Sequence, residues 1–341
     1  MPPLPSSYAS LPFSDILISH VPASSPSPTP VILITLHRPQ KNNAFTDVMH
    51  TELASILPNL SVDPRVKAIV VTGSGRMFCA GADLDMGLSY ERDTVRSHRD
   101  GGGQVALAIH RVSLDEASHT PQYSKCFILG FVNIAICLGI SMCNKPVIAA
   151  INGSAVGVGI TMTLPMSIRI VSSSAKIGFV FARRGIVMEA CSSYFLPRLI
   201  GYSRATHLVT TGEVLPASHK LLEGLFSEIL PQEQVLERAL DIADDVARNC
   251  SNVSVMLMRD LMWRGPDSAE GAHLLDSKVL LGLFKGRDKD EGIQSFLEKR
   301  SPEFKGTMDD APDIWPWWEG VDIGVKTLRL EEEEGKAKAK L

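Results

Sequence analysis

The sequence has little of what marks several large protein classes. Its six cysteines form no CxxC pair and its nine histidines form no HExxH motif, so we predict neither a disulfide framework nor a structural zinc site. The 34 basic and 38 acidic side chains give a net charge of −4, which excludes a broad positive field for nucleic acid. The first thirty residues lack a positive segment followed by an apolar one, so we expect neither a secretory signal nor a transit peptide.

One long apolar run admits three interpretations. Residues 127–143 are interrupted mainly by Asn133 and fall short of the roughly twenty residues that usually cross a bilayer. We predict a buried or surface-lying helix rather than a membrane span, because a span would separate a helix from the strand on which it should pack. Residues 112–143 could also be an artefact of the gene model, such as an unspliced intron. Tryptic peptides of this segment from the native protein would exclude the artefact.

The rest of the chain predicts an α/β fold. Hydrophobic residues make up 45% and charged residues 21%, which is enough for a substantial core. Short apolar segments alternate with segments of helical periodicity. We expect strands at residues 15–19, 31–36, 66–72, 146–151 and 175–179, and helices after Thr46 and at residues 104–111, 234–249 and 291–299. The cluster of Trp315, Trp317 and Trp318 is expected to dock on the fold.

Two glycine-containing turns follow predicted strands, at residues 73–84 and 152–159. The first lacks both the Lys-Ser/Thr pair of a P-loop and the last glycine of a dinucleotide fingerprint. Turns and helix N-termini present free backbone N–H groups, and two such loops can direct one N–H each at a single oxygen to form an oxyanion hole. Tight turns with packing glycines are the alternative.

Three segments then occur in a specific order. Residues 37–45 resemble the pattern N-R-P-x-x-x-N-A-L, residues 78–84 resemble F-x-A-G-A-D-[IL], and residues 145–153 resemble K-P-x-I-A-A-x-N-G. Together they make residues 12–300, apart from 112–143, resemble the crotonase (enoyl-CoA hydratase/isomerase) superfamily. The resemblance implies an α/β fold, a crotonase-like spiral of repeated ββα units with a helical C-terminal trimerisation region. It also implies an acyl-CoA substrate and no separate cofactor, because CoA is part of the substrate.

The resemblance suggests a division of the chain into four parts. We expect an N-terminal extension at 1–11, the spiral core at 12–235 with its insertion at 112–143, a helical region at 236–300, and a docking segment with a disordered tail at 301–341. It further implies a homotrimer or a dimer of trimers, with no nucleic-acid partner.

The resemblance also assigns roles near the two turns. Ala82 and Val158 would supply the backbone N–H groups for the thioester oxygen, and Lys41 is a candidate for contact with the CoA phosphates, although an exposed Lys is often only solvated. The residues that would line the substrate channel are Ala80, Gly81, Ala82, Asp83, Leu84 and Gly157.

The two glutamates of the family's hydratases fall on Thr161 and Phe181 here, and neither side chain can transfer a proton as a carboxylate does. Glu189 remains, in a setting similar to the E-[GA]-C-S-S-Y segment of peroxisomal Δ3,Δ2-enoyl-CoA isomerases. The alternative for Glu189 is an ordinary first-turn glutamate stabilised by the helix dipole. Its apolar sequence neighbours should raise the pKa of its carboxyl by desolvation: Ile186, Val187, Met188 and Phe195.

These residues predict an isomerase that converts 3-enoyl-CoA to trans-2-enoyl-CoA in fatty-acid β-oxidation. An enoyl-CoA hydratase that uses Glu189 alone and a non-catalytic acyl-CoA-binding subunit are the alternatives. The terminal Ala339-Lys340-Leu341 resembles the Ser-Lys-Leu peroxisomal address, so we expect peroxisomal localisation through an import receptor.

Overall fold

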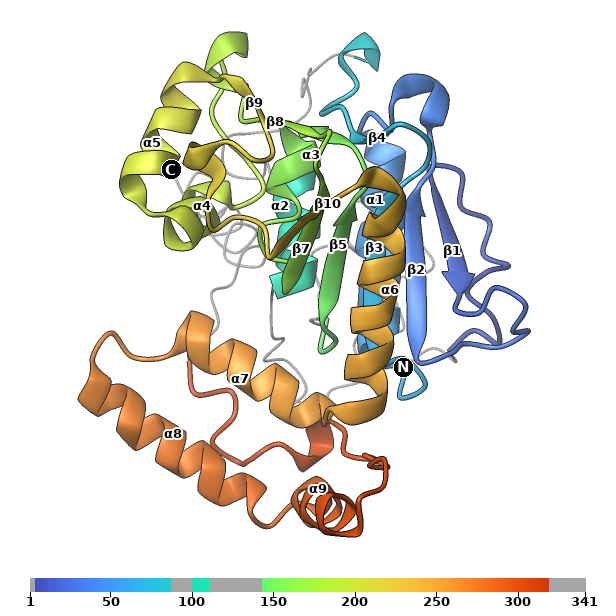
Figure 1. Ribbon diagram of the computed structural model, residues 1–341, viewed down its shortest axis with the longest axis vertical. Helices are drawn as coiled ribbons and strands as arrows, with labels where there is room; N and C mark the ends of the chain where they lie inside the picture. The colour runs from blue at the N-terminus through green and yellow to red at the C-terminus, as the bar shows by residue number, and fades with distance from the viewer. Residues whose placement is uncertain (1–3, 87–99, 111–142, 319–341) are drawn as a thin grey trace, which may run out of the picture.

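A computed structural model describes residues 4–86, 100–110 and 143–318 (Figure 1). In this part of the chain a six-stranded sheet has the order β1-β2-β3-β5-β7-β10, and a four-stranded sheet has the order β4-β6-β8-β9. The larger sheet comprises β1 (Ile16–His20), β2 (Val31–Leu36), β3 (Ala68–Gly73), β5 (Val147–Ile151), β7 (Ile168–Ser172) and β10 (Glu228–Leu230). The smaller comprises β4 (Met77–Cys79), β6 (Ser154–Val156), β8 (Lys176–Gly178) and β9 (Val214–Pro216).

The chain repeats one ββα pattern. The first strand of each repeat enters the larger sheet, the second enters the smaller sheet, and a helix follows. The repeats are β3, β4 and α2 (Gly101–His110), then β5, β6 and α3 (Val158–Thr161), then β7, β8 and α4 (Ser192–Ile200). Successive strands of each sheet are parallel in these repeats. The predicted spiral of ββα units is therefore present.

The central strands are mostly apolar on both sides, as expected where both faces of the larger sheet are covered. In β3, Ala68 and Val70 pack against α6 (Gln232–Asn249), whereas Ile69 and Val71 point into the main core. The period of two along a strand explains this division. The side of α6 that meets the sheet carries Val235, Ala239 and Ala243, and Figure 1 shows this helix lying along the sheet.

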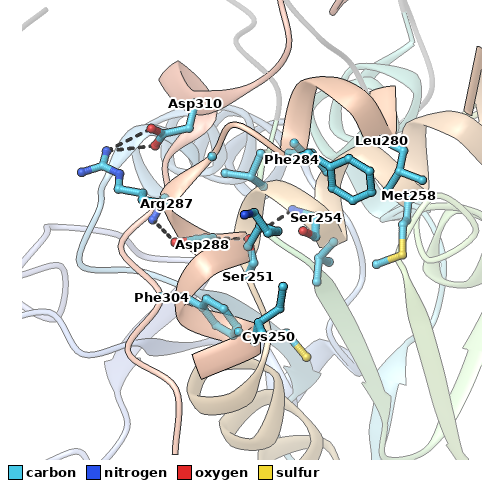
Figure 2. A pocket seen from close by; sticks show the side chains of 18 residues that line it. Cys250, Ser251, Ser254, Met258, Leu280, Phe284, Arg287, Asp288, Phe304 and Asp310 are labelled. Atoms are coloured by element: carbon cyan, nitrogen blue, oxygen red, sulfur yellow. Dashed lines mark hydrogen bonds and ion pairs between the residues drawn. The ribbon is translucent and has the colours of Figure 1, made fainter. Parts of the chain in front are cut away.

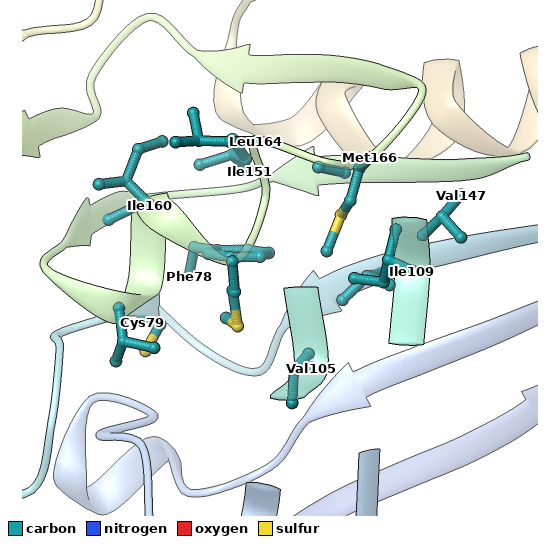
Figure 3. Packing of buried hydrophobic residues seen from close by; sticks show 14 of the residues in the cluster. Phe78, Cys79, Val105, Ile109, Val147, Ile151, Ile160, Leu164 and Met166 are labelled. Atoms are coloured by element: carbon teal, nitrogen blue, oxygen red, sulfur yellow. The ribbon is translucent and has the colours of Figure 1, made fainter. Parts of the chain in front are cut away.

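The main core lies on the other face of the larger sheet. Figure 3 shows Phe78 and Cys79 of β4 in one apolar cluster with Val105 of α2 and Ile160 of α3. The helix α1 (Asp47–Val62) closes this core, and Thr46 caps it by accepting a hydrogen bond from the Met49 N–H at 3.0 Å. Apolar residues within or next to the two glycine turns, such as Phe78 and Ile160, thus hold both turns against one core.

The remaining helices lie toward the C-terminus. They are α5 (Tyr202–Thr211), α7 (Asn252–Arg264), α8 (Ala269–Leu283) and α9 (Arg287–Glu298). Short 3₁₀ helices occur along the described chain at Pro39–Lys41, Leu84–Met86, Ala182–Arg184, Lys220–Leu222 and Met308–Asp310. Figure 1 shows α7, α8 and α9 set apart below the sheets. The tryptophan cluster docks on α7, as predicted: the indole N–H of Trp315 donates to Asp260 at 3.0 Å, and that of Trp317 donates to the Arg264 carbonyl at 3.0 Å.

Several expected elements differ in extent. The glycine-rich turn predicted after β3 contains the three-residue strand β4, and β7 was not predicted. The predicted boundary after residue 235 falls inside α6, whose apolar side packs on the sheet, so this helix belongs with the core. Within the described ranges no helix combines the length and apolar character needed to cross a membrane. The apolar run at 127–143 lies almost wholly outside those ranges.

Candidate active site

The two glycine turns lie against each other. Gly81 follows β4 with φ +101°, and Gly157 precedes α3 with φ +55°; both values favour glycine. A Cβ placed on Gly157 would lie 3.8 Å from the Gly81 Cα, and one on Gly81 would lie 3.1 Å from the Val156 carbonyl oxygen. The structure therefore brings together two segments that are about seventy-five residues apart in sequence, as a shared oxyanion site requires.

The Ala82 and Val158 amides have no hydrogen-bond acceptor among the described residues. On either side of Ala82, the Phe45 N–H donates to the Gly81 carbonyl at 2.8 Å and the Asp83 N–H donates to the Phe45 carbonyl at 2.9 Å. In this parallel bridge the intervening Ala82 N–H points away from Phe45. Val158 is the first residue of α3, where N–H groups have no partner within the helix. Both predicted donors are thus available to a ligand oxygen.

Glu189 lies in the turn before α4, outside the first helical turn proposed by the alternative interpretation. Ala190 and Cys191, which follow it, both have left-handed backbone conformations, with φ +57° and +53°. Such conformations are costly for residues other than glycine and persist only where their surroundings hold them. The turn therefore fixes the direction of the Glu189 side chain.

The two carboxylate oxygens of Glu189 have different surroundings. Oε1 accepts a 2.6 Å hydrogen bond from the Thr161 hydroxyl. Oε2 is buried and has no partner among the described residues. Burial raises the pKa of Glu189 to about 7; the Thr161 hydrogen bond opposes this rise and the Asp100 charge adds to it. A carboxyl with this pKa can accept and return a proton near neutral pH.

The burial of Glu189 comes only in part from the sequence neighbours that we expected to provide it: Phe195 is buried and Met188 packs against the main core. Val187 is 84% exposed and Ile186 is 45% exposed, so neither shields the carboxyl. Instead, Gly102 and Val158 lie beside it: a Cβ on Gly102 would lie 1.9 Å from Oε2 and 3.0 Å from the Val158 Cγ2. The carboxyl thus faces the residue that carries one of the two free amides.

Asp100 anchors this arrangement and was not predicted. Its Oδ1 accepts a 3.1 Å hydrogen bond from the Ala190 N–H and another from the Gly103 N–H at the start of α2. Asp100 therefore ties the Glu189 turn to α2. The run Gly101-Gly102-Gly103 before a predicted helix was the available signal, since glycines permit such a close approach.

The two positions of the hydratase glutamates are occupied as the sequence indicated. Thr161 is buried on α3 and donates to Glu189, and Phe181 is buried in the main core. A second carboxylate therefore cannot come from these positions.

The remaining substrate-binding candidates surround the Ala82 turn. Asp83 is buried and pairs with Arg38 at 2.9 Å, which fixes the turn instead of offering a free charge. Lys41 is exposed and pairs with Asp85 at 2.7 Å, while Leu84 is exposed. The Ala80 N–H donates to the Asn42 carbonyl at 3.1 Å. In the described ranges no cluster of three or more His, Cys, Asp or Glu residues could hold a metal ion.

A separate groove of about 420 Å³ lies in the C-terminal helical region, away from Glu189 (Figure 2). Cys250, Met258, Phe284 and Phe304 give it a mainly apolar lining. The ion pair between Arg287 and Asp310, with 3.0 Å between its atoms, lies at its side. None of its lining residues belongs to the site around Glu189.

Comparison with known proteins identifies relatives over most of the chain. The chain is 49% identical over 279 residues to the enoyl-CoA hydratase AFT3-1 of Alternaria alternata, covering 82% of this chain and 84% of that protein. It is 30% identical over 298 residues to the 1,2-epoxyphenylacetyl-CoA isomerase of Escherichia coli, covering 86% of this chain and 99% of that protein. An enoyl-CoA hydratase structure from Bacillus anthracis matches with a TM-score of 0.68 and 26% identity, over 86% of this chain and all of that one.

The model of the enoyl-CoA hydratase/isomerase family matches residues 27–108 and 130–307. The match omits residues 109–129, which fall mostly within the segment that interrupts the sequence pattern. Together with the ββα spiral and the paired glycine turns, these findings show that the chain belongs to the enoyl-CoA hydratase/isomerase family of the crotonase superfamily.

Proposed function

We propose that the protein is an isomerase that converts 3-enoyl-CoA to trans-2-enoyl-CoA, with Glu189 as its only proton carrier. One observation carries the proposal: a single carboxyl with a pKa of about 7 faces the residue that holds a free amide, while Thr161 and Phe181 fill the positions where hydratases have two glutamates. Moving a double bond requires one group that accepts and returns a proton. Adding water requires in addition that the water be held and activated.

The reaction begins at C2 of the 3-enoyl thioester. The Glu189 carboxylate removes a C2 proton, the electrons of that C–H bond form a C1=C2 bond, and the C1=O electrons move to the thioester oxygen while the C3=C4 bond is kept. The Ala82 and Val158 amides donate to this oxygen, which stabilises the dienolate. The thioester C1=O bond then re-forms, the C1=C2 electrons form the C2=C3 bond, and the C3=C4 electrons take the proton from the Glu189 acid at C4, which regenerates the carboxylate. Protons and charge balance without any other reactant.

Two alternative functions compete with isomerisation. The name of one relative, the enoyl-CoA hydratase AFT3-1, favours hydration, which here would use Glu189 with a water molecule. A non-catalytic acyl-CoA-binding subunit is the other reading, since two acidic positions of the family are changed.

The test presents purified protein with 3-hexenoyl-CoA and, separately, with 2-hexenoyl-CoA. Isomerase activity predicts 2-hexenoyl-CoA from the first substrate and no 3-hydroxyhexanoyl-CoA from the second. Rapid hydration of 2-hexenoyl-CoA without isomerisation would reject the proposal in favour of a hydratase. Binding of both thioesters without turnover would indicate the non-catalytic subunit.

We also propose a homotrimer, or a dimer of trimers, assembled through the C-terminal helices. Apolar side chains of α8 and α9 are strongly exposed, among them Leu281, Phe296 and Leu297, and the same two helices contribute Leu280 and Ile293 to the groove of Figure 2. Burying such surface between copies would remove it from water. Sedimentation analysis should show a trimer or hexamer for the wild type and smaller species for Leu281→Glu; a monomeric wild type would contradict the proposal.

The proposals for the residue that contacts CoA and for the cellular location of the protein rest on the sequence. Lys41 would exchange its exposed ion pair with Asp85 for a CoA phosphate, so Lys41→Ala should raise KM more than it lowers kcat.

The C-terminal tripeptide Ala339-Lys340-Leu341 lies outside the described residues, and we propose that it directs the enzyme to peroxisomes for β-oxidation. A fluorescent protein fused to the N-terminus should appear in peroxisomes only while these three residues are present.

A further inference from the structure

Thr161 occupies a position that links the oxyanion turn to Glu189. Its hydroxyl oxygen lies 2.6 Å from Oε1 of Glu189 and 3.2 Å from the Gly157 carbonyl oxygen. The side chain is fully buried on α3, whose first residue, Val158, carries one of the free amides. A single short helix therefore holds both an oxyanion donor and the partner of the catalytic carboxylate.

We propose that Thr161 is a positioning residue that holds Oε1, so that Oε2 alone carries the proton between the two acyl carbons. This inference rests on the proposed isomerase function, and it assigns a role to a residue that replaces an acid of the family's hydratases. It also specifies which oxygen reacts.

The geometry distinguishes the two oxygens. Oε1 already accepts the Thr161 hydroxyl hydrogen, and that bond is possible whether the carboxyl is ionised or protonated on Oε2. Oε2 lies against Gly102 on the side of Val158, where a Cβ on Gly102 would be 1.9 Å from it. Oε2 is buried and has no donor among the described residues, so it is the carboxylate oxygen left free to accept a proton.

A fixed carboxyl has a consequence for the fate of the proton. No rotation about the carboxyl group is needed between removal at C2 and return at C4, because Oε2 performs both transfers. The proton is also shielded from solvent while Oε2 holds it, since this oxygen is buried. Most of the hydrogen taken from C2 should therefore appear at C4 of the product instead of exchanging with water.

The charged and titratable groups around the carboxyl set its proton affinity. Among the described residues, Asp100 at the start of α2 and the thiol of Cys79 on β4 interact electrostatically with Glu189. Burial raises the pKa of the Cys79 thiol to about 12, so it stays neutral near pH 7. Thr161 stabilises the carboxylate, whereas Asp100 destabilises it. Loss of the hydroxyl should therefore raise the pKa of Glu189 by roughly one to two units, the usual value of a hydrogen bond to a charged group.

The test compares the wild type with Thr161→Val, Thr161→Ala and Thr161→Ser. The matched control is Thr163→Val: Thr163 is also buried, but its hydroxyl donates to the Ile160 carbonyl at 2.8 Å and not to Glu189. Infrared difference spectroscopy, with Glu189→Gln to assign the band, titrates the carboxyl without requiring turnover. Activity on 3-hexenoyl-CoA deuterated at C2 gives kcat, KM, the pH profile and the fraction of deuterium found at C4.

The proposal predicts that Thr161→Val and Thr161→Ala raise the carboxyl pKa, lower kcat about tenfold or more with little change in KM, and lose most of the deuterium to water. Thr161→Ser and Thr163→Val should resemble the wild type. If one of the two hydroxyl-free variants fails to fold, the other provides the comparison.

Two results would overturn the proposal in distinguishable ways. If the wild type isomerises but both hydroxyl-free variants keep its pH profile and deuterium retention, Thr161 does not position the carboxyl. If the wild type does not isomerise at all, the proposed function fails, and with it the role of Oε2 in proton transfer. The infrared titration then still reports whether the Thr161 hydrogen bond sets the Glu189 pKa.

Discussion

Replacing Glu189 by Gln should stabilise the protein at alkaline pH and leave it nearly unchanged at acidic pH. The fold raises the pKa of this carboxyl from 4.5 to about 7, chiefly by burial. The folded state therefore favours the neutral acid, and its relative stabilisation is fully present below pH 4.5 and is lost as the pH rises through 7. Glutamine has the same shape and does not ionise, so the variant lacks this loss.

The magnitude follows from the size of the shift. A rise of about 2.5 pKa units corresponds to about 3 kcal/mol at 1.36 kcal/mol per unit. The free energy of unfolding of the wild type should thus fall by about this amount, relative to Glu189→Gln, between pH 4.5 and pH 9.

Urea unfolding followed by tryptophan fluorescence would measure this difference at several pH values and one protein concentration. Glu233→Gln, in the exposed first turn of α6, is the control for removing one negative charge. It should follow the pH dependence of the wild type. Parallel curves for the wild type and Glu189→Gln across this range would refute the raised pKa, and with it the argument that Glu189 exchanges a proton near neutrality.

Three further changes test the parts of the site separately. Asp100→Asn keeps an oxygen for the Ala190 and Gly103 amides but removes the charge that adds to the rise of the Glu189 pKa. The acidic limb of the pH profile of kcat/KM should therefore move to lower pH. A limb at the wild-type position would contradict the role of the Asp100 charge. Val158→Pro removes one oxyanion donor at the first helical position, which accepts proline, so kcat should fall about 10²–10³-fold. The control Val158→Ala keeps the amide and should retain activity. Equal kcat values for the two variants would exclude this amide as an oxyanion donor. Gly102→Ala places a Cβ 1.9 Å from Oε2 of Glu189, so the carboxyl should be displaced and kcat should fall about 10²-fold. Circular dichroism should show that the fold is kept. Full activity of this variant would show that Oε2 lies elsewhere.

Much of the fold could be predicted from local patterns. The nearly continuous apolar run at residues 66–72 indicated a strand buried on both faces, and Thr46 indicated the start of a helix. The strand β4 was not predicted because it has only three residues inside a glycine-rich segment, and its pairing partner, β6, is distant in sequence. Short strands of this kind depend on tertiary contacts more than on their own residues.

The site shows the same division between local and distant contacts. Glu189, Ala82 and Val158 could be proposed because each lies in a segment with a recognisable pattern. Asp100 could not, since its hydrogen bond to Ala190 spans ninety residues and its importance depends on a backbone conformation that sequence does not reveal. The apolar neighbours of Glu189 in sequence suggested its burial, but Ile186 and Val187 are exposed, and Gly102 of α2 and Val158 of α3 lie beside the carboxyl.

The central claim is that one carboxyl moves the proton while two main-chain amides hold the charge. Its most direct test is the steady-state rate of wild type and Glu189→Gln on 3-hexenoyl-CoA, with CoA affinity measured in parallel. The account predicts that the wild type forms 2-hexenoyl-CoA and that the variant loses about 10²–10⁴-fold in kcat with unchanged CoA binding. A variant that isomerises within a few-fold of the wild-type rate would contradict the account.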